Sequence, residues 1–197
     1  MNNIALARIE EFATAVEKSA KRAIVSKRVS GAWELQEKKP QFTAKVEYAK
    51  GKTEFKAEAP VMLGGWGNNP DPIQYFLFGV ASCFAATVAV NASREGIKLT
   101  KLEVTAETQM NMRKYLGLSK DRITENIKLN VVARGPSQQV LKKLLKVSQE
   151  RCPGVEWVTS KIPLEVKLEI TKAQGSWHPA TTSKAQYGAG CRVRNAK

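Results

Sequence analysis

The sequence predicts an α+β fold in which antiparallel sheets pack around one buried central helix. Segments of alternating apolar and polar residues occur before and after the middle of the chain. Between these two groups lies a run that is apolar on all sides, and a second amphipathic helix pattern follows the later strands. Strands and helices in this order favour helices packed against antiparallel sheet. With 197 residues the chain is long enough to bury one sizeable core.

The first part of the chain predicts one helix and three strands. Residues 3–24 carry apolar side chains near one face of a helix, and these are Ile4, Ile9, Phe12, Ala13, Val16 and Ala20. The segments "VSGAWEL", "FTAKVEY" and "TEFKAEA" then alternate and are separated by "EKKP" and "KGK". They predict antiparallel strands with a hairpin at Gly51.

The central helix has clear start and stop signals. "LGGWGNNPDP" is rich in turn formers, and Asp71 and Pro72 suit the N-cap and the first helical position. The pattern continues to about Glu95, and Gly96 suits the C-cap. Its apolar residues point in all directions, and they include Ile73, Phe76, Leu77, Val80, Ala81, Phe84, Val88 and Val90. Such a helix is expected to be buried.

The second part predicts two long strands, a helix and a last strand. "LEVTAETQMNM" and "NIKLNVVA" alternate, and "RKYLGLSKDRITE" between them is long enough to be a flap. "GPSQQVLKKLLKVSQER" predicts a helix that begins at Ser137 and ends at "CPG", and "PLEVKLEI" predicts a final strand. We therefore expect an N-terminal helix over 1–28, one domain over 29–172, and a loosely ordered basic tail over 173–197.

Composition narrows the possible functions. The formal net charge is +14, which could attract nucleic acid, but no nucleic-acid motif accompanies it and a solvated basic surface is favoured. No uninterrupted apolar run approaches the roughly 18 residues of a membrane span, and the N-terminus does not resemble a secretory signal. We expect a cytoplasmic protein. With one histidine and three unclustered cysteines, no metal site or cofactor is expected.

Cys83 lies in the middle of the central helix and has two interpretations. It sits about three turns from the helix start, too far to gain from the helix dipole, and apolar surroundings should raise the pKa of its thiol. Taken alone it favours an inert core cysteine. To act as a nucleophile it needs a cation from elsewhere in the chain or from a partner subunit.

Cys152 lies where its helix ends, before Pro153 and Gly154. A helix C-terminus disfavours a thiolate, so Cys152 is a poor first nucleophile but a plausible resolving thiol. An incidental cysteine at a helix end is an equal alternative. Cys191 lies in the predicted tail and is treated as incidental.

The order of these segments resembles the OsmC/Ohr family, the osmotically inducible protein C and organic hydroperoxide reductase proteins. The resemblance covers about residues 29–170 and rests on "NNPDPIQYFLFGVASCFAATVAV", "SREGIKLTKLEV", "MNMRKYLGLSKDRITENIKLNVVA" and "VLKKLLKVSQERCPGVEWVTSKIPLEV". It implies an intertwined homodimer with the central helices in the middle and two sites at the interface.

The resemblance also implies a chemistry associated with the oxidative stress response. Cys83 would be the peroxidatic thiol that attacks a small-molecule hydroperoxide, Cys152 would resolve the sulfenic acid, and an unidentified dithiol reductant would reopen the disulfide. Phe76, Val80 and Phe84 are candidates for an apolar substrate pocket, or are ordinary core residues.

The sequence departs from the hydroperoxide reductases at the start of the central helix. Those proteins have a glutamate directly after the helix-starting proline, paired with an arginine. Here Ile73 follows the proline, and next comes Gln74, where many relatives have a glutamate, so Gln74 is a candidate binding residue. The candidate cations are Lys50, Lys52 and Arg113. The departure leaves two hypotheses, which are a thiol-dependent peroxidase and a non-catalytic dimer that binds a small apolar or sulfur-containing ligand.

Overall fold

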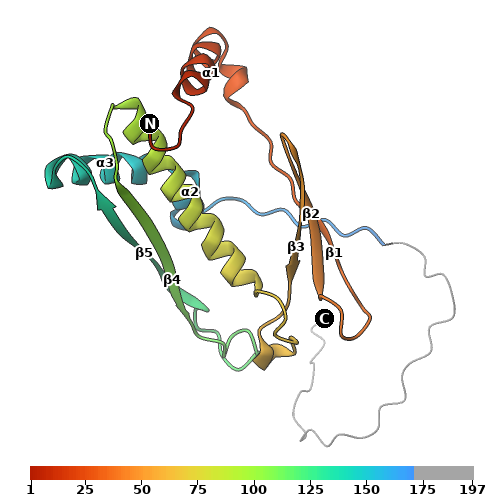
Figure 1. The fold of residues 1–197 in the computed structure, drawn as a ribbon. Helices are drawn as coiled ribbons and strands as arrows, with labels where there is room; N and C mark the ends of the chain where they lie inside the picture. The colour runs from red at the N-terminus through yellow and green to blue at the C-terminus, as the bar shows by residue number, and fades with distance from the viewer. Residues whose placement is uncertain (171–197) are drawn as a thin grey trace, which may run out of the picture. The chain divides into compact units, whose positions relative to one another are not determined.

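The computed structural model describes residues 1–170 and divides the chain into two units, Met1–Ile162 and Pro163–Lys197. The predicted tail and Cys191 lie outside the described residues. The elements are, in chain order, α1 (Leu6–Lys18), η1 (Ala20–Ala23), β1 (Ser30–Trp33), β2 (Phe42–Tyr48), β3 (Gly51–Ala57), η2 (Val61–Leu63), α2 (Pro72–Arg94), β4 (Lys101–Met110), β5 (Thr124–Arg134), α3 (Gln138–Arg151) and α4 (Pro153–Thr159) (Figure 1).

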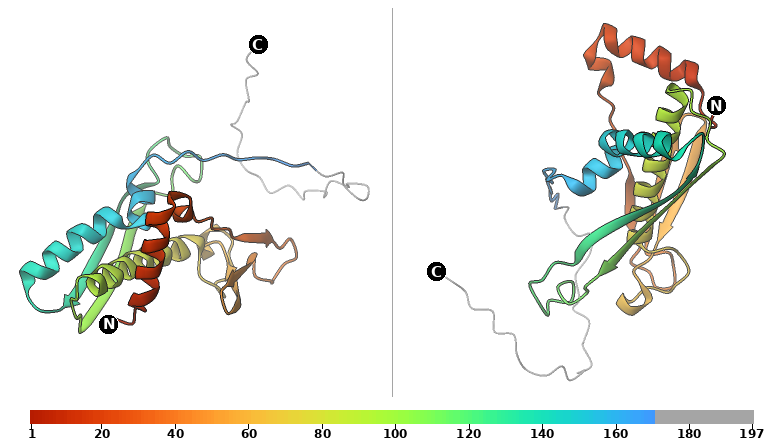
Figure 2. Two further views of the ribbon diagram at one scale, coloured as in Figure 1. Left: turned by 90° about the horizontal axis from the view of Figure 1, so that it is seen from above. Right: turned by 90° about the vertical axis from the view of Figure 1, so that its left-hand side faces the viewer.

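The predicted α+β fold with antiparallel sheets is confirmed. β1, β2 and β3 form one antiparallel sheet in that order, and β4 pairs with β5 in a second. The register of the first sheet places Tyr48 opposite Gly51, so the predicted hairpin turns through Ala49 and Lys50. Figures 1 and 2 show α2 running beside the β4–β5 pair, and α3 packs on α2.

The N-terminal helix is shorter than predicted. α1 ends at Lys18 because Ser19 is extended, and one 3-10 turn follows. The first residues instead attach to the end of α2. The Asn2 amide donates to Ser93 Oγ (3.2 Å) and to the Ile97 carbonyl (2.8 Å), and its oxygen accepts from the Leu99 N–H (2.9 Å). Asn2 thereby satisfies polar groups where α2 ends.

α2 begins and ends where the sequence predicts. The Asp71 side chain accepts hydrogen bonds from the Ile73 and Gln74 N–H groups, and the Gln74 side chain accepts one from the Asp71 N–H, which makes a complete capping box. At the other end, Gly96 has a φ of +67°, a left-handed conformation that glycine adopts without strain.

Glu58, directly after β3, organises the loop that leads into α2. It is only 2% exposed, and its carboxylate accepts hydrogen bonds from the Asn68 N–H (3.0 Å) and the Asn69 side chain (2.8 Å). The Asn69 hydrogen bond, helped by backbone N–H groups at residues 66–68, holds the pKa of Glu58 below its usual value although burial opposes this. The ionised carboxylate therefore stabilises the loop.

Replacing Glu58 with glutamine is expected to lower the free energy of unfolding at pH 7. The folded pKa lies below the unfolded one, so the carboxylate stabilises fully above the unfolded pKa of about 4.3. That contribution is lost as the pH falls through the folded pKa. Urea unfolding should therefore show a gap between wild type and variant at pH 7 that narrows in acid. The exposed Glu47→Gln on β2 is the control, and equal midpoints at pH 7 for wild type and Glu58→Gln would contradict this role.

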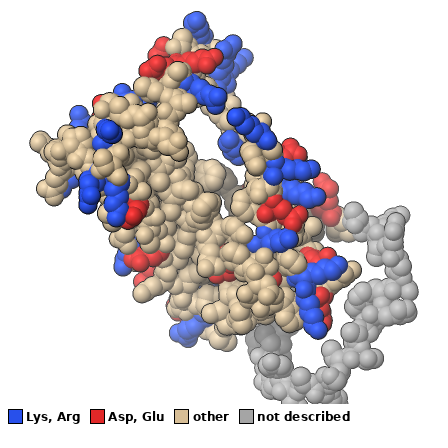
Figure 3. All heavy atoms as spheres, viewed as in Figure 1, with Lys and Arg blue, Asp and Glu red and all other residues tan. Residues whose placement is uncertain are grey.

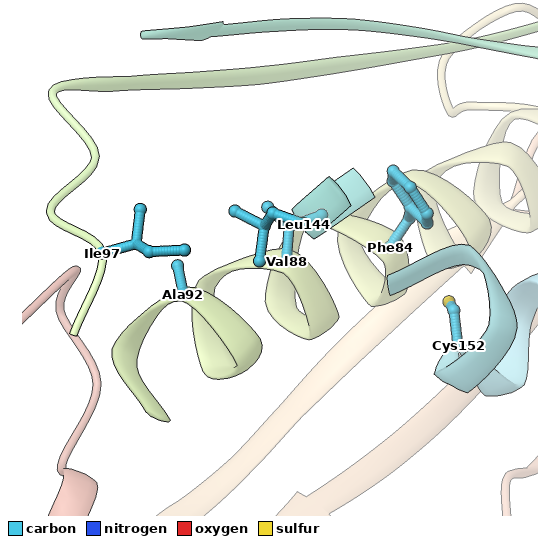
Figure 4. Close-up of a cluster of buried hydrophobic side chains, with 6 residues drawn as sticks. All are labelled: Phe84, Val88, Ala92, Ile97, Leu144 and Cys152. Carbon is cyan, nitrogen blue, oxygen red and sulfur yellow. The ribbon is translucent and has the colours of Figure 1, made fainter. Parts of the chain in front are cut away.

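The core lies between α2, the β4–β5 pair and α3. Its fully buried members are Phe84, Val88, Ala92, Ile97, Leu144 and Cys152. Figure 4 shows them in a row along α2, with Cys152 at the Phe84 end. The inward-facing residues of β4 and β5 cover this row, since the two strands are half-buried at every second position. Cys152 is thus part of the core although it stands at a helix end.

α2 is only partly buried in the single chain. Phe78 is 65% exposed, and Ile73 and Phe76 are exposed as well.

By length and composition α2 could cross a membrane, with a mean hydropathy of 1.8 over 18 residues. This corrects the expectation that no segment of the chain would be long and apolar enough for a membrane span. Its buried Asn91 and Ser93 and its packing against β4 and α3 are those of a core helix. Figure 3 shows few charged side chains over α2, whose only charged residue is Arg94.

The prediction of a final strand over 163–170 is wrong for the described residues. This segment is extended but belongs to no sheet, and Leu164, Val166, Leu168 and Ile170 are all exposed. Alternation of apolar and polar residues predicts a strand, but a strand also needs a neighbouring edge with which to form hydrogen bonds.

Candidate thiol site

Cys83 lies on the face of α2 that meets α4. It is half-buried, and it packs against the hydrophobic core beside Phe84. The fit between the two helices depends on Gly154. A β-carbon at this position would stand 3.1 Å from Cys83 Cβ and 3.4 Å from Cys83 Sγ. The absence of a side chain at Gly154 therefore allows α4 to approach the thiol.

Cys152 stands at the junction of two helices. It is the C-cap of α3 and the N-cap of α4, with φ −85° and ψ 117°. This extended conformation is the one that the following Pro153 favours. The sequence predicted that α3 ends here, but not that a second helix begins at once. The junction directs the buried thiol of Cys152 toward α2, because its Sγ lies 3.7 Å from the Sγ of Cys83.

The separation of the two sulfur atoms is the central feature of the site. Both thiols are free. A disulfide has an S–S bond of about 2.05 Å, so a closure of less than 2 Å between the sulfurs would join them. Two residues 69 positions apart are thus placed to form a disulfide with each other when an oxidant removes two electrons.

Burial raises the pKa of the Cys83 thiol, and the neighbouring Cys152 raises it further. The backbone N–H of Gly154 opposes these effects with a hydrogen bond that favours the thiolate. Among residues 1–170, no cation contributes to the shift. In the single chain the thiolate form of Cys83 is therefore less populated than that of an ordinary exposed cysteine.

A buried polar network anchors the end of α3 that carries Cys152. Asn91 on α2 donates to Ser148 Oγ (3.2 Å), and its oxygen accepts from the Arg151 guanidinium (3.2 Å). Such a satisfied network fixes how α3 packs on α2. The sequence analysis did not single out these residues. The available signal was an asparagine in the predominantly apolar second half of α2.

The predicted polar site residues lie apart from the thiols in the single chain. Gln74 completes the capping box at the start of α2, nine residues and about 13 Å along the helix from Cys83. Arg113 lies in the flap, 3.9 Å from the Asp121 carboxylate and largely exposed. Within the described residues, no hydrogen bond or ion pair joins either of them to Cys83 or Cys152. Their roles remain predictions.

Two of the three predicted apolar residues line a hollow of about 640 Å³ beside the thiol pair. Val80 and Phe84 contribute to its α2 wall, whereas Phe76 is exposed elsewhere on α2. No group of three or more potential metal-ligating side chains occurs within residues 1–170. The site built by this part of the chain is thus a pair of thiols beside an apolar hollow.

The class of structure is thus a small α+β fold with a central apolar helix and two facing thiols, and comparison with known proteins identifies its family. The model of the OsmC-like protein family matches residues 65–167, more than half of the chain. The chain belongs to the OsmC-like family, as its sequence resemblance indicated. No curated protein matches the chain significantly.

Several solved structures share the fold. One is an organic hydroperoxide resistance protein OsmC from Legionella pneumophila, with 19% identity and a TM-score of 0.52 over 69% of this chain and 92% of that one. Another, from Elizabethkingia anophelis, is an organic hydroperoxide resistance protein with bound thiocyanate, with 17% identity and a TM-score of 0.51 over 68% and 90% of the two chains. A third, from Vibrio cholerae, has captopril in one of its active sites, with 18% identity and a TM-score of 0.50 over 69% and 87%.

Proposed function

We propose that this protein is a thiol-dependent peroxidase that reduces organic or related hydroperoxides. The observation that carries the proposal is the 3.7 Å separation of the Cys83 and Cys152 sulfur atoms. Membership of the OsmC-like family supports it, as do the names of similar structures that refer to hydroperoxide resistance. The different burial of the two thiols supports separate roles, because Cys83 is half-buried and Cys152 is buried.

The proposed reaction takes three steps. The Cys83 thiolate attacks the terminal oxygen of the hydroperoxide and the O–O bond breaks, so that Cys83 becomes a sulfenic acid. The displaced alkoxide takes a proton from solvent and leaves as the alcohol. The Cys152 thiol then attacks this sulfur and releases water, which forms the Cys83–Cys152 disulfide. A dithiol reductant finally takes up the two oxidising equivalents and restores both thiols. We place this cycle in the cytoplasm, where such reductants keep thiols reduced.

The proposed active unit is a homodimer. The exposed first turns of α2 carry Ile73 and Phe76 on one side and Phe78 on another, and large exposed apolar side chains on a stretch without charges favour contact with a second protein surface. A second copy would bury these side chains and would also bring a cation toward Cys83, for which Arg113 is our candidate.

The dimer can be tested by sedimentation velocity at micromolar concentration. We expect one species with twice the chain mass, and we expect Phe78→Glu to shift it toward the monomer because a buried charge is costly. Lys98→Glu, at an exposed position beyond the end of α2, is the control. A wild-type protein that sediments as a monomer would contradict the proposed dimer.

A second candidate function is a non-catalytic dimer that binds a small apolar or sulfur-containing ligand. The observation that favours it is the raised pKa of Cys83 together with the lack of a contributing cation in residues 1–170. A thiol in this state is a weak nucleophile at neutral pH. The apolar hollow beside the thiols would then be the functional feature.

The pH dependence of Cys83 alkylation tests whether the pKa of this thiol is raised or whether a neighbouring cation activates it. Because burial raises the pKa of Cys83, the thiolate fraction grows about tenfold per pH unit below that pKa. We expect the rate of iodoacetamide modification, followed by mass spectrometry of the Cys83 peptide, to rise about tenfold per unit between pH 7 and 9. A rate that is already constant at pH 7 would contradict the raised pKa and would indicate a cation beside the thiol.

The peroxidase proposal is tested by turnover. The purified full-length protein is mixed with cumene hydroperoxide and dithiothreitol, and loss of hydroperoxide is followed over many equivalents. Catalytic consumption over the rate of dithiothreitol alone supports the peroxidase. Absence of consumption between pH 7 and 9 would leave the binding function as the better account of the same fold.

A further inference from the structure

The hollow beside the thiol pair is built from four elements of the first unit. Its wall is predominantly apolar, and the apolar lining residues are Val80, Phe84, Ile127, Leu129, Val131, Leu145, Val155 and Val158. They come from α2, β5, α3 and α4. Its volume of about 640 Å³ lies within the range of about 300–1,000 Å³ that is typical of small-molecule sites.

The charged residues that line the hollow are all basic. Lys142 and Lys146, one turn apart on α3, are its only charged lining residues, and Gln149 and Thr159 supply the remaining polar groups. Neither lysine forms an ion pair within residues 1–170. An adjoining hollow shares Lys146, Gln149, Val155 and Thr159 with the first and adds two acidic residues, Glu150 and Glu156. The side of the first hollow nearest Lys142 is therefore the more positive one.

We propose that this hollow binds an aliphatic carboxylate, with its chain against the apolar wall and its carboxylate at Lys142 and Lys146. An apolar wall with two neighbouring cations at the edge complements a molecule that has one long apolar part and one negative end. A cationic amphiphile of the same length would meet two like charges. A neutral alcohol of the same length would contact the apolar wall but would leave the two lysines without a counter-charge.

The proposed carboxylate site uses the hollow beside the thiols but not the thiols themselves. The two cysteines are absent from the lining, although their neighbours Val80, Phe84 and Val155 form part of it. The carboxylate is therefore a bound ligand rather than a substrate. Carboxylate binding does not depend on whether Cys83 reacts with hydroperoxides, so a direct measurement of binding tests this proposal independently of turnover.

The charge requirement is tested by calorimetric titration of the reduced full-length protein with decanoate, kept below its micelle concentration. We expect saturable binding of decanoate, weaker binding of decanol and none of decylammonium. Lys142→Gln combined with Lys146→Gln should weaken decanoate binding between about threefold and thirtyfold, as expected for two partly exposed ion pairs. The control combines Lys143→Gln with Lys98→Gln, which changes the net charge equally at positions outside the lining.

The position of the ligand is tested by two tryptophan variants, one at a residue that lines the hollow and one at a residue that does not. Gln149 lines the hollow and is exposed, so Gln149→Trp should block decanoate binding without disturbing the core. Gln139→Trp places the same side chain elsewhere on α3 and should leave binding unchanged. The proposal is overturned if decanoate does not bind. It is also overturned if decylammonium binds equally well, or if both tryptophan variants behave alike.

Discussion

Replacing Cys83 with serine is expected to abolish hydroperoxide turnover, with a decrease of at least about a thousandfold, as for other catalytic nucleophiles. A serine hydroxyl is not ionised at neutral pH and cannot become a sulfenic acid. The loss should be seen in the cumene hydroperoxide assay with dithiothreitol. The fold should persist, because Cys83 is only half-buried and the exchange removes little volume.

Serine variants at the other two cysteines distinguish the roles of the thiols. Cys152→Ser should still react once, and its sulfenic acid at Cys83 should be trapped by dimedone, but the intramolecular disulfide cannot form. Cys191→Ser removes the third thiol of the chain and should turn over at the wild-type rate. Full activity in Cys83→Ser would rule out the proposed nucleophile.

The largest effect on stability is expected at Leu144. This side chain of α3 is 1% exposed and belongs to the same buried cluster as Val88 and Ala92 of α2. Replacing it with alanine should lower the free energy of unfolding by about 3 kcal/mol, because the lost methyl groups leave a cavity that close-packed neighbours cannot fill. Urea unfolding followed by circular dichroism measures the difference.

The neighbouring Lys143 provides a matched control on the same helix. It is exposed, so Lys143→Ala should change the free energy of unfolding by no more than about 0.5 kcal/mol. If Leu144→Ala were as mild as this control, the core would not lie between α2 and α3 as described. Since α3 also carries Cys152 at its end, the variant should slow disulfide formation too.

Much of the fold could be predicted from local signals. Asp71, Pro72 and Gly96 mark the ends of α2, Ser137 begins α3, and alternation identifies the strands of both sheets. These signals act within a few residues and do not depend on distant contacts. The segment 163–170 alternates equally well but forms no strand in the described chain. Pairing depends on an available edge, which alternation cannot reveal.

The candidate site was harder to predict because it depends on packing. Each cysteine taken alone favoured an inert or incidental residue as much as a reactive one, and only the family resemblance paired them. Their 3.7 Å separation depends on how α3 and α4 meet α2, through Gly154 and the Asn91 network. Glu58 was missed for a similar reason, since the N–H groups that hold it come from a loop ten residues away.

The pairing of the two thiols is tested most directly by treating the reduced protein with one equivalent of an alkyl hydroperoxide. Free thiols are then counted, and the disulfides are mapped by mass spectrometry. The account predicts rapid loss of two thiols and one linkage, Cys83–Cys152, that does not form in Cys83→Ser. Unchanged thiols, or a linkage through Cys191 instead, would contradict the proposed two-cysteine site.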